Sequence, residues 1–278
     1  MGVLGGVSVE DKLLAFCRRA LSALVIAAAA VPLYLLIKQA LTPELESFAW
    51  PPAWLPKSLT LTYLNGVIAT GELRVALMLS ARVAVAAELL ATGLGTMLAY
   101  AMARDARARG LGLTALSVTR LLPMVAAAMP LATILIRLRL YDTASGLGLA
   151  LVHGALALPA AAILLFGAFV KIPLELEHAA YLDGASPLAI FLRLDLPLVR
   201  GALAAAFVLS FLASWDEFGF ALLLQPTNRT LPPLIYYYTV FGDAGAASAL
   251  ALVSAVPVLI ALIALRPVLL HGLRGRAR

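Results

Sequence analysis

Four consecutive residues with chemically useful side chains stand inside a long apolar stretch of this 278-residue chain. They are Trp215, Asp216, Glu217 and Phe218. An ionisable group at membrane depth usually faces a bundle interior or a water-filled path, so the two adjacent carboxylates are not both expected to face lipid. Beside an aromatic ring they can hydrogen-bond a polyhydroxy substrate or gate its passage. Alternatively, they pair with intramembrane arginines, such as Arg82 or Arg120, and hold helices together.

Other residues that could support catalysis or metal binding are sparse. Cys17 is the only cysteine, and the histidines His153, His178 and His271 are far apart. This pattern excludes a disulfide framework and a zinc cluster. The sequence has no G-x-x-x-x-G-K-[ST] loop that could bind the phosphates of ATP. It also lacks the matched acid and base on facing helices that an intramembrane enzyme would need. We therefore expect no catalytic residue, no bound cofactor and no metal in this chain.

The composition is that of a membrane protein. Hydrophobic residues make up 63% of the chain and charged residues 13%, against about 45–50% and about 25% in soluble domains. Lysine and arginine are scattered at the ends of apolar segments, which argues against nucleic-acid binding. Arg82, Glu88 and Asp216 lie within apolar runs and would suit a secondary transporter, but no inverted repeat of the sequence supports one.

Six apolar runs are long enough to cross the hydrocarbon core, which takes about 20 residues. They occupy residues 20–37, 75–102, 113–136, 144–169, 202–224 and 246–265. Most lysines and arginines fall on the cytoplasmic side if both termini are cytoplasmic, as the positive-inside rule requires. We expect an all-α fold, a polytopic bundle of six transmembrane helices whose first span is retained rather than cleaved as a signal peptide.

The spans divide the chain into segments. Residues 1–40 hold the N-terminal segment and the first span, 41–74 an extracytoplasmic loop, 75–268 the remaining spans and their connections, and 269–278 a basic cytoplasmic tail. A second outer loop covers about residues 225–245. It contains Tyr236, Tyr237 and Tyr238, which would form an aromatic belt at the membrane surface or stack on sugar rings.

The segment at residues 171–200 is the longest polar stretch on the predicted inner side. Pro173 suits the first position of a helix, and Gly184 follows an aspartate in a dipeptide that ends one. Ser186 then predicts the cap of a second short helix, which should stop before Pro197. This helical hairpin either packs on its own bundle or docks into another protein.

Residues 177–186 read EHAAYLDGAS, and Phe191 and Pro197 follow them. This pattern resembles the cytoplasmic EAA loop of type I ABC importer permeases. Further matches to the sugar-importer branch of that family, in particular to the shorter six-span permease subunit of maltose- and trehalose-type systems, occur at residues 99–104, 140–143, 171–177, 214–218 and 229–232.

The resemblance implies that residues 171–200 form a coupling loop, whose helix inserts into a groove of a separate ATP-binding subunit. The residues that it assigns to coupling are Glu177, His178, Ala179, Ala180, Asp183, Gly184, Ala185 and Ser186. One position departs from the family pattern, because His178 stands where a glutamate usually precedes the two alanines. Glu177 matches the glutamate often found one position earlier. The histidine would either supply a different hydrogen bond or face water.

The resemblance also implies the rest of the importer. It comprises a second permease subunit, two ATP-binding subunits that hold ATP and Mg²⁺, and an extracytoplasmic solute-binding protein, in the cell membrane of a bacterium or archaeon. The substrate would be a sugar, and a polyamine, phosphate or metal ion is the alternative within the family. Because the loop between the last two spans helps to contact the binding protein in this family, Tyr236, Tyr237 and Tyr238 gain a third role.

Overall fold

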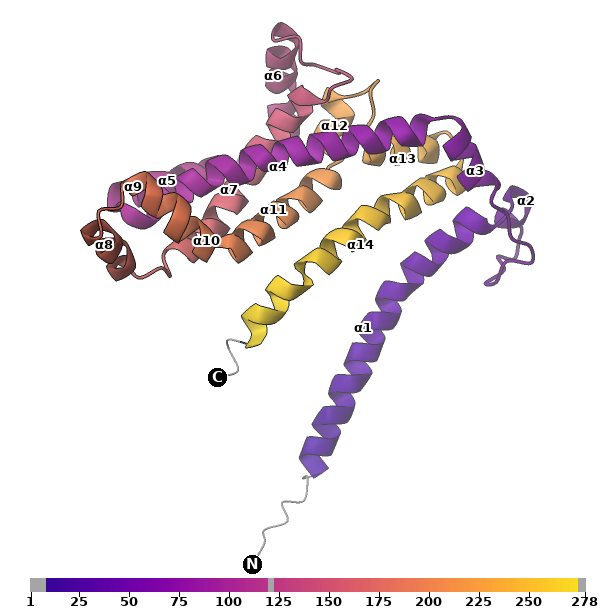
Figure 1. Cartoon of the computed structure of the whole chain (residues 1–278). Coiled ribbons are helices and arrows are strands. Elements are labelled where there is room, and N and C mark those ends of the chain that lie inside the picture. The colour runs from indigo at the N-terminus through magenta and orange to yellow at the C-terminus, as the bar shows by residue number, and fades with distance from the viewer. Residues whose placement is uncertain (1–8, 120–122, 275–278) are drawn as a thin grey trace, which may run out of the picture.

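The computed structural model describes residues 9–119 and 123–274, and every regular element in that part of the chain is a helix (Figure 1). Among the described residues, four helices are long and apolar enough to cross a membrane, namely α1 (Val9–Leu41), α4 (Glu72–Arg104), α7 (Leu147–Phe169) and α14 (Ala244–Arg274). The expectation of an all-α, polytopic membrane protein is confirmed.

Two of the predicted spans are not single helices. The third, expected over residues 113–136, is divided between α5 (Ala106–Val118) and α6 (Met124–Arg137), and the N-cap of α6 is Pro123. A proline disfavours helical backbone in the residue before it. The fifth, expected over residues 202–224, is divided between α11 (Arg200–Trp215) and α12 (Gly219–Leu224). The sequence analysis placed one span in each of these runs and did not locate the breaks, because an apolar run does not by itself show where a helix ends.

The packing of α4 against α7 forms the centre of the bundle. The two helices run side by side, and α11 contacts both (Figure 1). A Cβ added at Gly154 would lie 3.1 Å from the carbonyl oxygen of Ala87, and one added at Gly95 would lie 3.2 Å from the backbone nitrogen of Ala162. Backbones can approach this closely only through small residues, as is usual where membrane helices pack.

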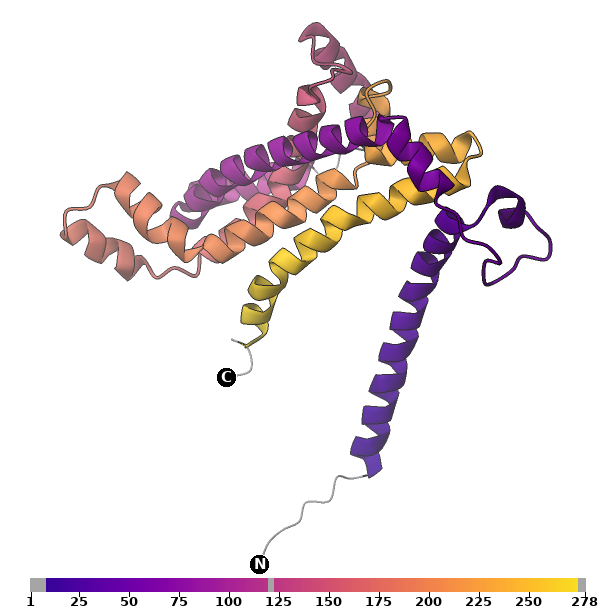
Figure 2. The same cartoon turned by 45° about the vertical axis from the view of Figure 1, so that its right-hand side comes forward.

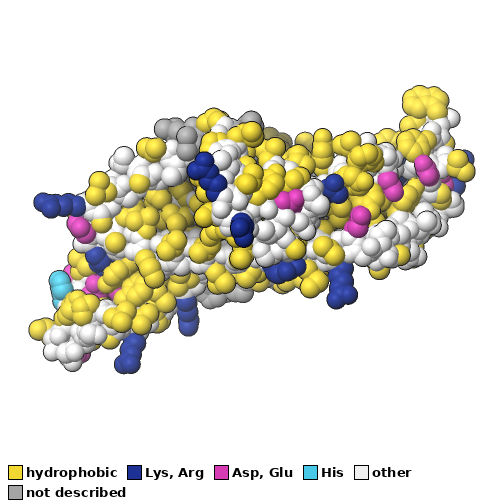
Figure 3. Space-filling model, turned by 90° about the horizontal axis from the view of Figure 1, so that it is seen from above, with side chains coloured by type: hydrophobic (Ala, Val, Ile, Leu, Met, Phe, Trp, Pro, Cys, Tyr) yellow, Lys and Arg dark blue, Asp and Glu magenta, His cyan; other side chains and the backbone are white. Residues whose placement is uncertain are grey.

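The helices at the two ends of the chain lie at the edge of this centre. α14 contacts α11, and α1 contacts α14 and α3 (Thr62–Ala69) before it diverges from the bundle (Figure 2). The most apolar stretch of α1 has no buried residue, and hydrophobic side chains cover much of the molecular face in Figure 3. Such a surface suits contact with lipid or with other subunits rather than with water.

Short helices occupy the two ends of the bundle. The end that carries residues 171–200 is called the loop end below. The opposite end, called the far end, carries α2 (Glu44–Ser47), α3, α12 and α13 (Leu231–Val240). Figure 1 shows the two ends separated by the length of α4.

The loop end contains the helix, the glycine turn and the second helix that the sequence predicts. The first helix, α8 (Leu174–Leu182), begins one residue after Pro173 and ends at a turn in which Gly184 has a φ of +83°. Glycine adopts this left-handed backbone at little steric cost. Ser186 then caps α9 (Pro187–Ile190), because its hydroxyl oxygen accepts a hydrogen bond from the backbone N–H of Ala189 at 3.3 Å.

The predicted stop before Pro197 is wrong. The chain continues as a π-helix, η2 (Phe191–Asp195), and as α10 (Leu196–Leu198), so Pro197 lies in a first helical turn. The segment from α9 to α10 meets α11 at an angle of 72°. The second helix of the hairpin therefore leads directly into α11 through a bend.

The close approach of α4 and α7 requires a small residue at position 154, and this requirement can be tested. We expect Gly154→Val to destabilise the purified full-length chain by about 1–3 kcal/mol, because the added side chain overpacks against the backbone of α4. The matched control is Gly167→Val in the same helix, where an added Cβ has no neighbour within 4 Å. Thermal unfolding in detergent measures both, and equal melting temperatures would contradict the packing described.

Candidate functional site

The residues assigned to coupling lie together in α8 and in the turn that follows it. Exposed members of the set are His178, Ala179, Asp183, Gly184 and Ser186, and half-buried members are Ala180 and Ala185. Leu182, at the end of α8, is 89% exposed. Glu177 alone in the set is buried. The hairpin therefore presents an outer surface of small and apolar side chains that surrounds His178.

Glu177 points inward and pairs with Arg104, the last residue of α4. The guanidinium of Arg104 also lies 3.9 Å from the carboxylate of Asp195 in η2. It donates a hydrogen bond to the carbonyl oxygen of Phe169, the last residue of α7, at 3.2 Å, and lies 5.4 Å from the ring centroid of Tyr100. One arginine thus joins the ends of α4 and α7 to both arms of the hairpin.

This cluster places two carboxylates beside one guanidinium. The side chain of Asp195 is completely buried, and those of Glu177 and Arg104 are only 9% and 16% exposed. Burial raises the pKa of Asp195 to about 6, as does the nearby charge of Glu177, while Arg104 opposes both effects. Sequence reasoning assigned Glu177 to the docking surface and missed its internal partner. A basic residue at the end of a span was the available signal.

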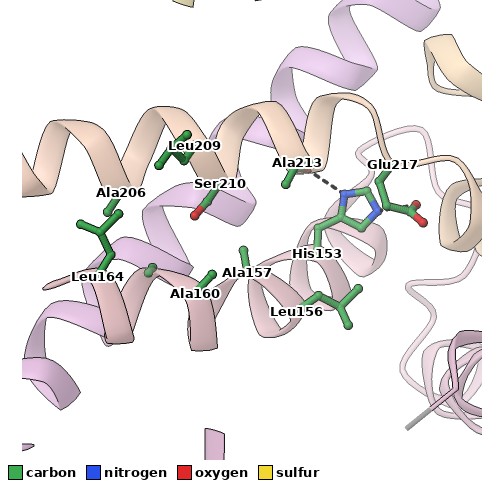
Figure 4. A pocket seen from close by; sticks show the side chains of 12 residues that line it. His153, Leu156, Ala157, Ala160, Leu164, Ala206, Leu209, Ser210, Ala213 and Glu217 are labelled. Atoms are coloured by element: carbon green, nitrogen blue, oxygen red, sulfur yellow. Dashed lines mark hydrogen bonds and ion pairs between the residues drawn. The ribbon is translucent and has the colours of Figure 1, made fainter. Parts of the chain in front are cut away.

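A cleft of about 280 Å³ separates α7 from α11, beside the break in the fifth predicted span (Figure 4). His153 of α7 is 3% exposed and bridges this break. Its Nδ1 lies 2.8 Å from the Ser214 hydroxyl, and its Nε2 lies 3.1 Å from a carboxylate oxygen of Glu217. Because an ionised carboxylate only accepts hydrogen bonds, we assign the donated proton to Nε2 and the accepting role to Nδ1.

Glu217 also organises the chain after the break. Its carboxylate oxygens accept hydrogen bonds from the backbone N–H groups of Phe220 at 2.8 Å and Ala221 at 2.9 Å. These groups belong to the first turn of α12, where helical N–H groups have no partners of their own. Glu217 thus links the start of α12 to α7 through His153. Neither contact was predicted, although a histidine within an apolar run is itself a signal of an intramembrane site.

The structure separates the four residues that the sequence grouped as a gate. Trp215 is buried, stacks on Phe211 and donates a hydrogen bond from Nε1 to the carbonyl oxygen of Ser254 at 3.1 Å, which ties α11 to α14. Asp216 is exposed. Phe218 packs edge-on against Tyr236, with ring centroids 5.2 Å apart. Of the four residues, Glu217 lines the cleft.

The alternative pairing of these carboxylates with intramembrane arginines is wrong for Arg82. That side chain is exposed, and its Nε donates to the carbonyl oxygen of Met78 in the preceding turn. Arg120 lies outside the described residues. In the described part of the chain, Glu217 takes His153 as its hydrogen-bond partner instead. A histidine and two backbone N–H groups therefore donate the hydrogen bonds to Glu217 that were expected from an arginine.

A second polar cluster closes the far end. Asp142 accepts hydrogen bonds from the backbone N–H groups of Asn228 at 2.9 Å and Thr227 at 3.1 Å, and the Tyr141 hydroxyl donates to the carbonyl oxygen of Leu223 at 3.1 Å. The loop before α7 is thereby fastened to the loop between α12 and α13. Burial by itself would raise the pKa of Asp142, but the hydrogen bonds from Asn228 and Thr227 outweigh it and lower the pKa.

The three predicted tyrosines lie on α13 at this end. Tyr236 is 47% exposed. The guanidinium of Arg229 lies 4.2 Å from the ring centroid of Tyr237, and the hydroxyl of Tyr238 donates to the Glu72 carboxylate at 2.8 Å. Tyr237 and Tyr238 are thus engaged within the chain, and Tyr236 is the tyrosine of α13 most open to a partner.

The Arg104 cluster predicts how the hairpin responds to loss of its cation. We expect Arg104→Gln to loosen residues 171–200 strongly, because removing one partner of a buried ion pair costs about 3–5 kcal/mol. Limited proteolysis of the full-length chain in detergent should cleave this segment faster than in the wild type. Arg107→Gln, at an exposed position three residues later, is the control. Equal cleavage rates in the two variants would contradict the anchoring role.

The Asp142 cluster predicts a pH dependence at the far end. A carboxylate whose pKa is lower in the folded than in the unfolded chain stabilises the fold. This stabilisation is complete at pH values above the pKa of the unfolded chain, and it is lost as the pH falls through the pKa of the folded chain. Hydrogen exchange at the Thr227 and Asn228 amides, corrected for intrinsic rates, should therefore show protection at pH 7 that declines below about pH 4. Asp142→Asn should lower this protection already at pH 7, and the exposed Asp183→Asn should not.

Comparison with known proteins places these features in a family. The model of the binding-protein-dependent transport system inner membrane component matches residues 91–268, which include the hairpin, the cleft and the far-end cluster. The sulfoquinovosyl glycerol transport system permease protein of Agrobacterium fabrum is 31% identical over 201 residues, covering 71% of this chain and 70% of that relative. The trehalose transport system permease protein of Mycobacterium tuberculosis is 29% identical over 230 residues, covering 80% and 83%.

The fold has a counterpart among solved structures. A bacterial ABC transporter involved in the import of the acidic polysaccharide alginate contains a chain that aligns with a TM-score of 0.72 at 19% identity, covering 94% of this chain and 98% of that one. At this identity the likeness concerns the fold alone. The family match covers more than half of the present chain. The chain therefore belongs to the binding-protein-dependent transport system inner membrane components, and is the multi-pass permease, not the ATPase, of an ABC importer in a prokaryotic cell membrane.

Proposed function

We propose that this permease carries a sugar across the membrane together with a second permease subunit. Two ATP-binding subunits drive the cycle with ATP and Mg²⁺, and an extracytoplasmic binding protein delivers the sugar. Support for a sugar comes from the relatives, whose names specify trehalose and sulfoquinovosyl glycerol. The family match supports the division of labour, because it describes the chain as the membrane component of a binding-protein-dependent system.

The topology that fits this role has six membrane crossings and cytoplasmic termini. The crossings are α1, α4, α5 with α6, α7, α11 with α12, and α14. The loop end then faces the cytoplasm, and the far end faces outward. The permease domain covers residues 75–268, between the outer loop at residues 41–74 and the basic tail at residues 269–278. The excess of basic residues on the loop side supports this orientation.

The observation that carries the proposal is the anchored but exposed hairpin at the loop end. Its core residues are fixed by Arg104, while Leu182 at the end of α8 is 89% exposed, and no described residue of the chain covers it. A large apolar side chain left exposed on an ordered tip suits insertion into a groove of another protein. The coupling residues 177–180 and 183–186 surround this tip, and His178 replaces a carboxylate at its exposed position.

Transmission of movement follows from the same contacts. When the ATP-binding subunits close, they push the hairpin, and Arg104 passes the displacement to α4 and α7. The bend after α10 passes it to α11. Packed cores switch between discrete arrangements rather than deforming continuously, so α4, α7, α11 and the hairpin move as one body between inward- and outward-facing states. A ligand or nucleotide then changes which arrangement is favoured.

At the far end, we assign the contact with the binding protein to α13. Tyr236 is its most accessible tyrosine, and Tyr237 and Tyr238 hold the helix through Arg229 and Glu72. The substrate route runs past the break between α11 and α12. Trp215 and Phe218 pack on either side of that break, Asp216 is exposed beside it, and Glu217 lines the cleft.

Docking of the hairpin can be tested with two leucines of matched exposure. We expect Leu182→Glu to abolish copurification with the ATP-binding subunits, because it places a charge on the apolar tip. Leu45→Glu is the control, since Leu45 is 93% exposed at the opposite end of the molecule. Both variants should still insert into the membrane. If the Leu182→Glu variant still copurifies with the ATP-binding subunits, the proposed docking of the hairpin is contradicted.

A further inference from the structure

The cleft between α7 and α11 has two chemically different walls. Ser210 and Ser214 recur at positions i and i+4 of α11, so their side chains point to the same side, and Glu217 in the break after α11 lines the same cleft. Figure 4 shows Ser210 facing α7, from which Ala157 and Ala160 form the opposite wall. Leucines at its edges, including Leu156, Leu164 and Leu209, complete the lining. The cleft thus pairs a polar stripe with an apolar surface.

This division matches the chemistry of a sugar ring. Hydroxyl groups project from the edge of a pyranose, while its faces carry C–H groups, so the ring can lie on small apolar side chains and hydrogen-bond along one side. The volume of about 280 Å³ is near the lower limit of ligand pockets, which run from about 300 to 1,000 Å³. The cleft therefore suits one sugar unit rather than a long chain.

The charges around the cleft indicate which sugars it can hold. Glu217 is an acceptor-only group at one end. Behind Ser210 lies Glu88 of α4, which is fully buried and whose carboxyl group lies beside the Ser210 hydroxyl. No lysine or arginine is among the twelve described residues that line the cleft, and His153 is already engaged with Glu217 and Ser214.

We propose that this cleft is a saccharide subsite within the present chain and that it selects neutral sugars over anionic ones. The proposal rests on the assignment of the chain as a sugar permease and specifies the substrate class. An anionic sugar would bring a second negative charge towards Glu217, and the described residues that line the cleft include no lysine or arginine to offset the repulsion between these like charges. A neutral sugar donates its hydroxyl protons to the same carboxylate without that cost.

Direct binding to the purified importer complex tests the subsite. The complex of both permeases and the ATP-binding subunits is used without its binding protein, so that selection by the binding protein does not contribute. Trehalose is the neutral probe and trehalose 6-phosphate the anionic one, and saturation-transfer difference NMR detects weak binding of either. We expect a signal from trehalose and at least a fivefold weaker signal from the phosphate ester.

Two variants and one control variant identify the site of binding. Ser210→Ala removes a hydroxyl from the polar stripe and should reduce the trehalose signal at least threefold. Ser117→Ala, at an exposed position on α5, should leave it unchanged. Glu217→Gln removes the negative charge and should raise the signal from the phosphate ester towards that of trehalose.

Several outcomes would overturn the proposal. These are absence of a trehalose signal from the wild-type complex, equal signals from the two sugars, and a trehalose signal that does not depend on Ser210. Loss of the companion permease from Ser210→Ala preparations would instead identify the cleft as a groove for helix packing. Stimulation of ATP hydrolysis by the sugar-loaded binding protein is measured in parallel. If it persists while the NMR result fails, the importer function stands and the subsite alone is refuted.

Discussion

The close contact of α4 with α7 is the constraint on which the other features depend. Small residues let the two backbones approach, and the pair then spans the distance between the loop end and the far end. At the loop end, Arg104 extends this contact to the hairpin. Towards the far end, the hydroxyl of Ser80 on α4 accepts a hydrogen bond from the backbone N–H of Leu231 at the start of α13, at 2.8 Å. A displacement of either end therefore reaches the other through one packed pair of helices.

Three irregular parts of the bundle are each held by one charged side chain. Arg104 joins the hairpin to α4 and α7, Glu217 caps α12 at the break in the fifth predicted span, and Asp142 fastens the far-end loops. Lipid offers no hydrogen bonds, so irregular backbone at membrane depth persists only where protein groups or water satisfy it. The breaks are thus ordered features that can line a path for a polar substrate, and the cleft beside Glu217 illustrates this.

The sequence was informative where structure is determined locally. The composition predicted a membrane-embedded helical protein, and Gly184 and Ser186 predicted the turn and the cap of the hairpin. It failed where partners come from distant parts of the chain. Apolar runs did not reveal the breaks in the third and fifth predicted spans, and the inward direction of Glu177 depends on Arg104, which lies on another helix. The pairing of Glu217 with His153 likewise required the fold, because residue spacing on one helix says nothing about the neighbouring helix.

The central claim is that the hairpin, α4, α7 and α11 move as one body when ATP is bound. The most direct measurement is the distance between spin labels at Glu175→Cys, on α8 of the hairpin, and Leu147→Cys, at the start of α7, in the assembled importer. Cys17 is the only native cysteine, so Cys17→Ser provides the background. Double electron–electron resonance should give the same distance distribution in the nucleotide-free and ATP-bound states. A distribution that shifts or splits on ATP binding would show that the hairpin moves independently of the bundle, and would contradict the account.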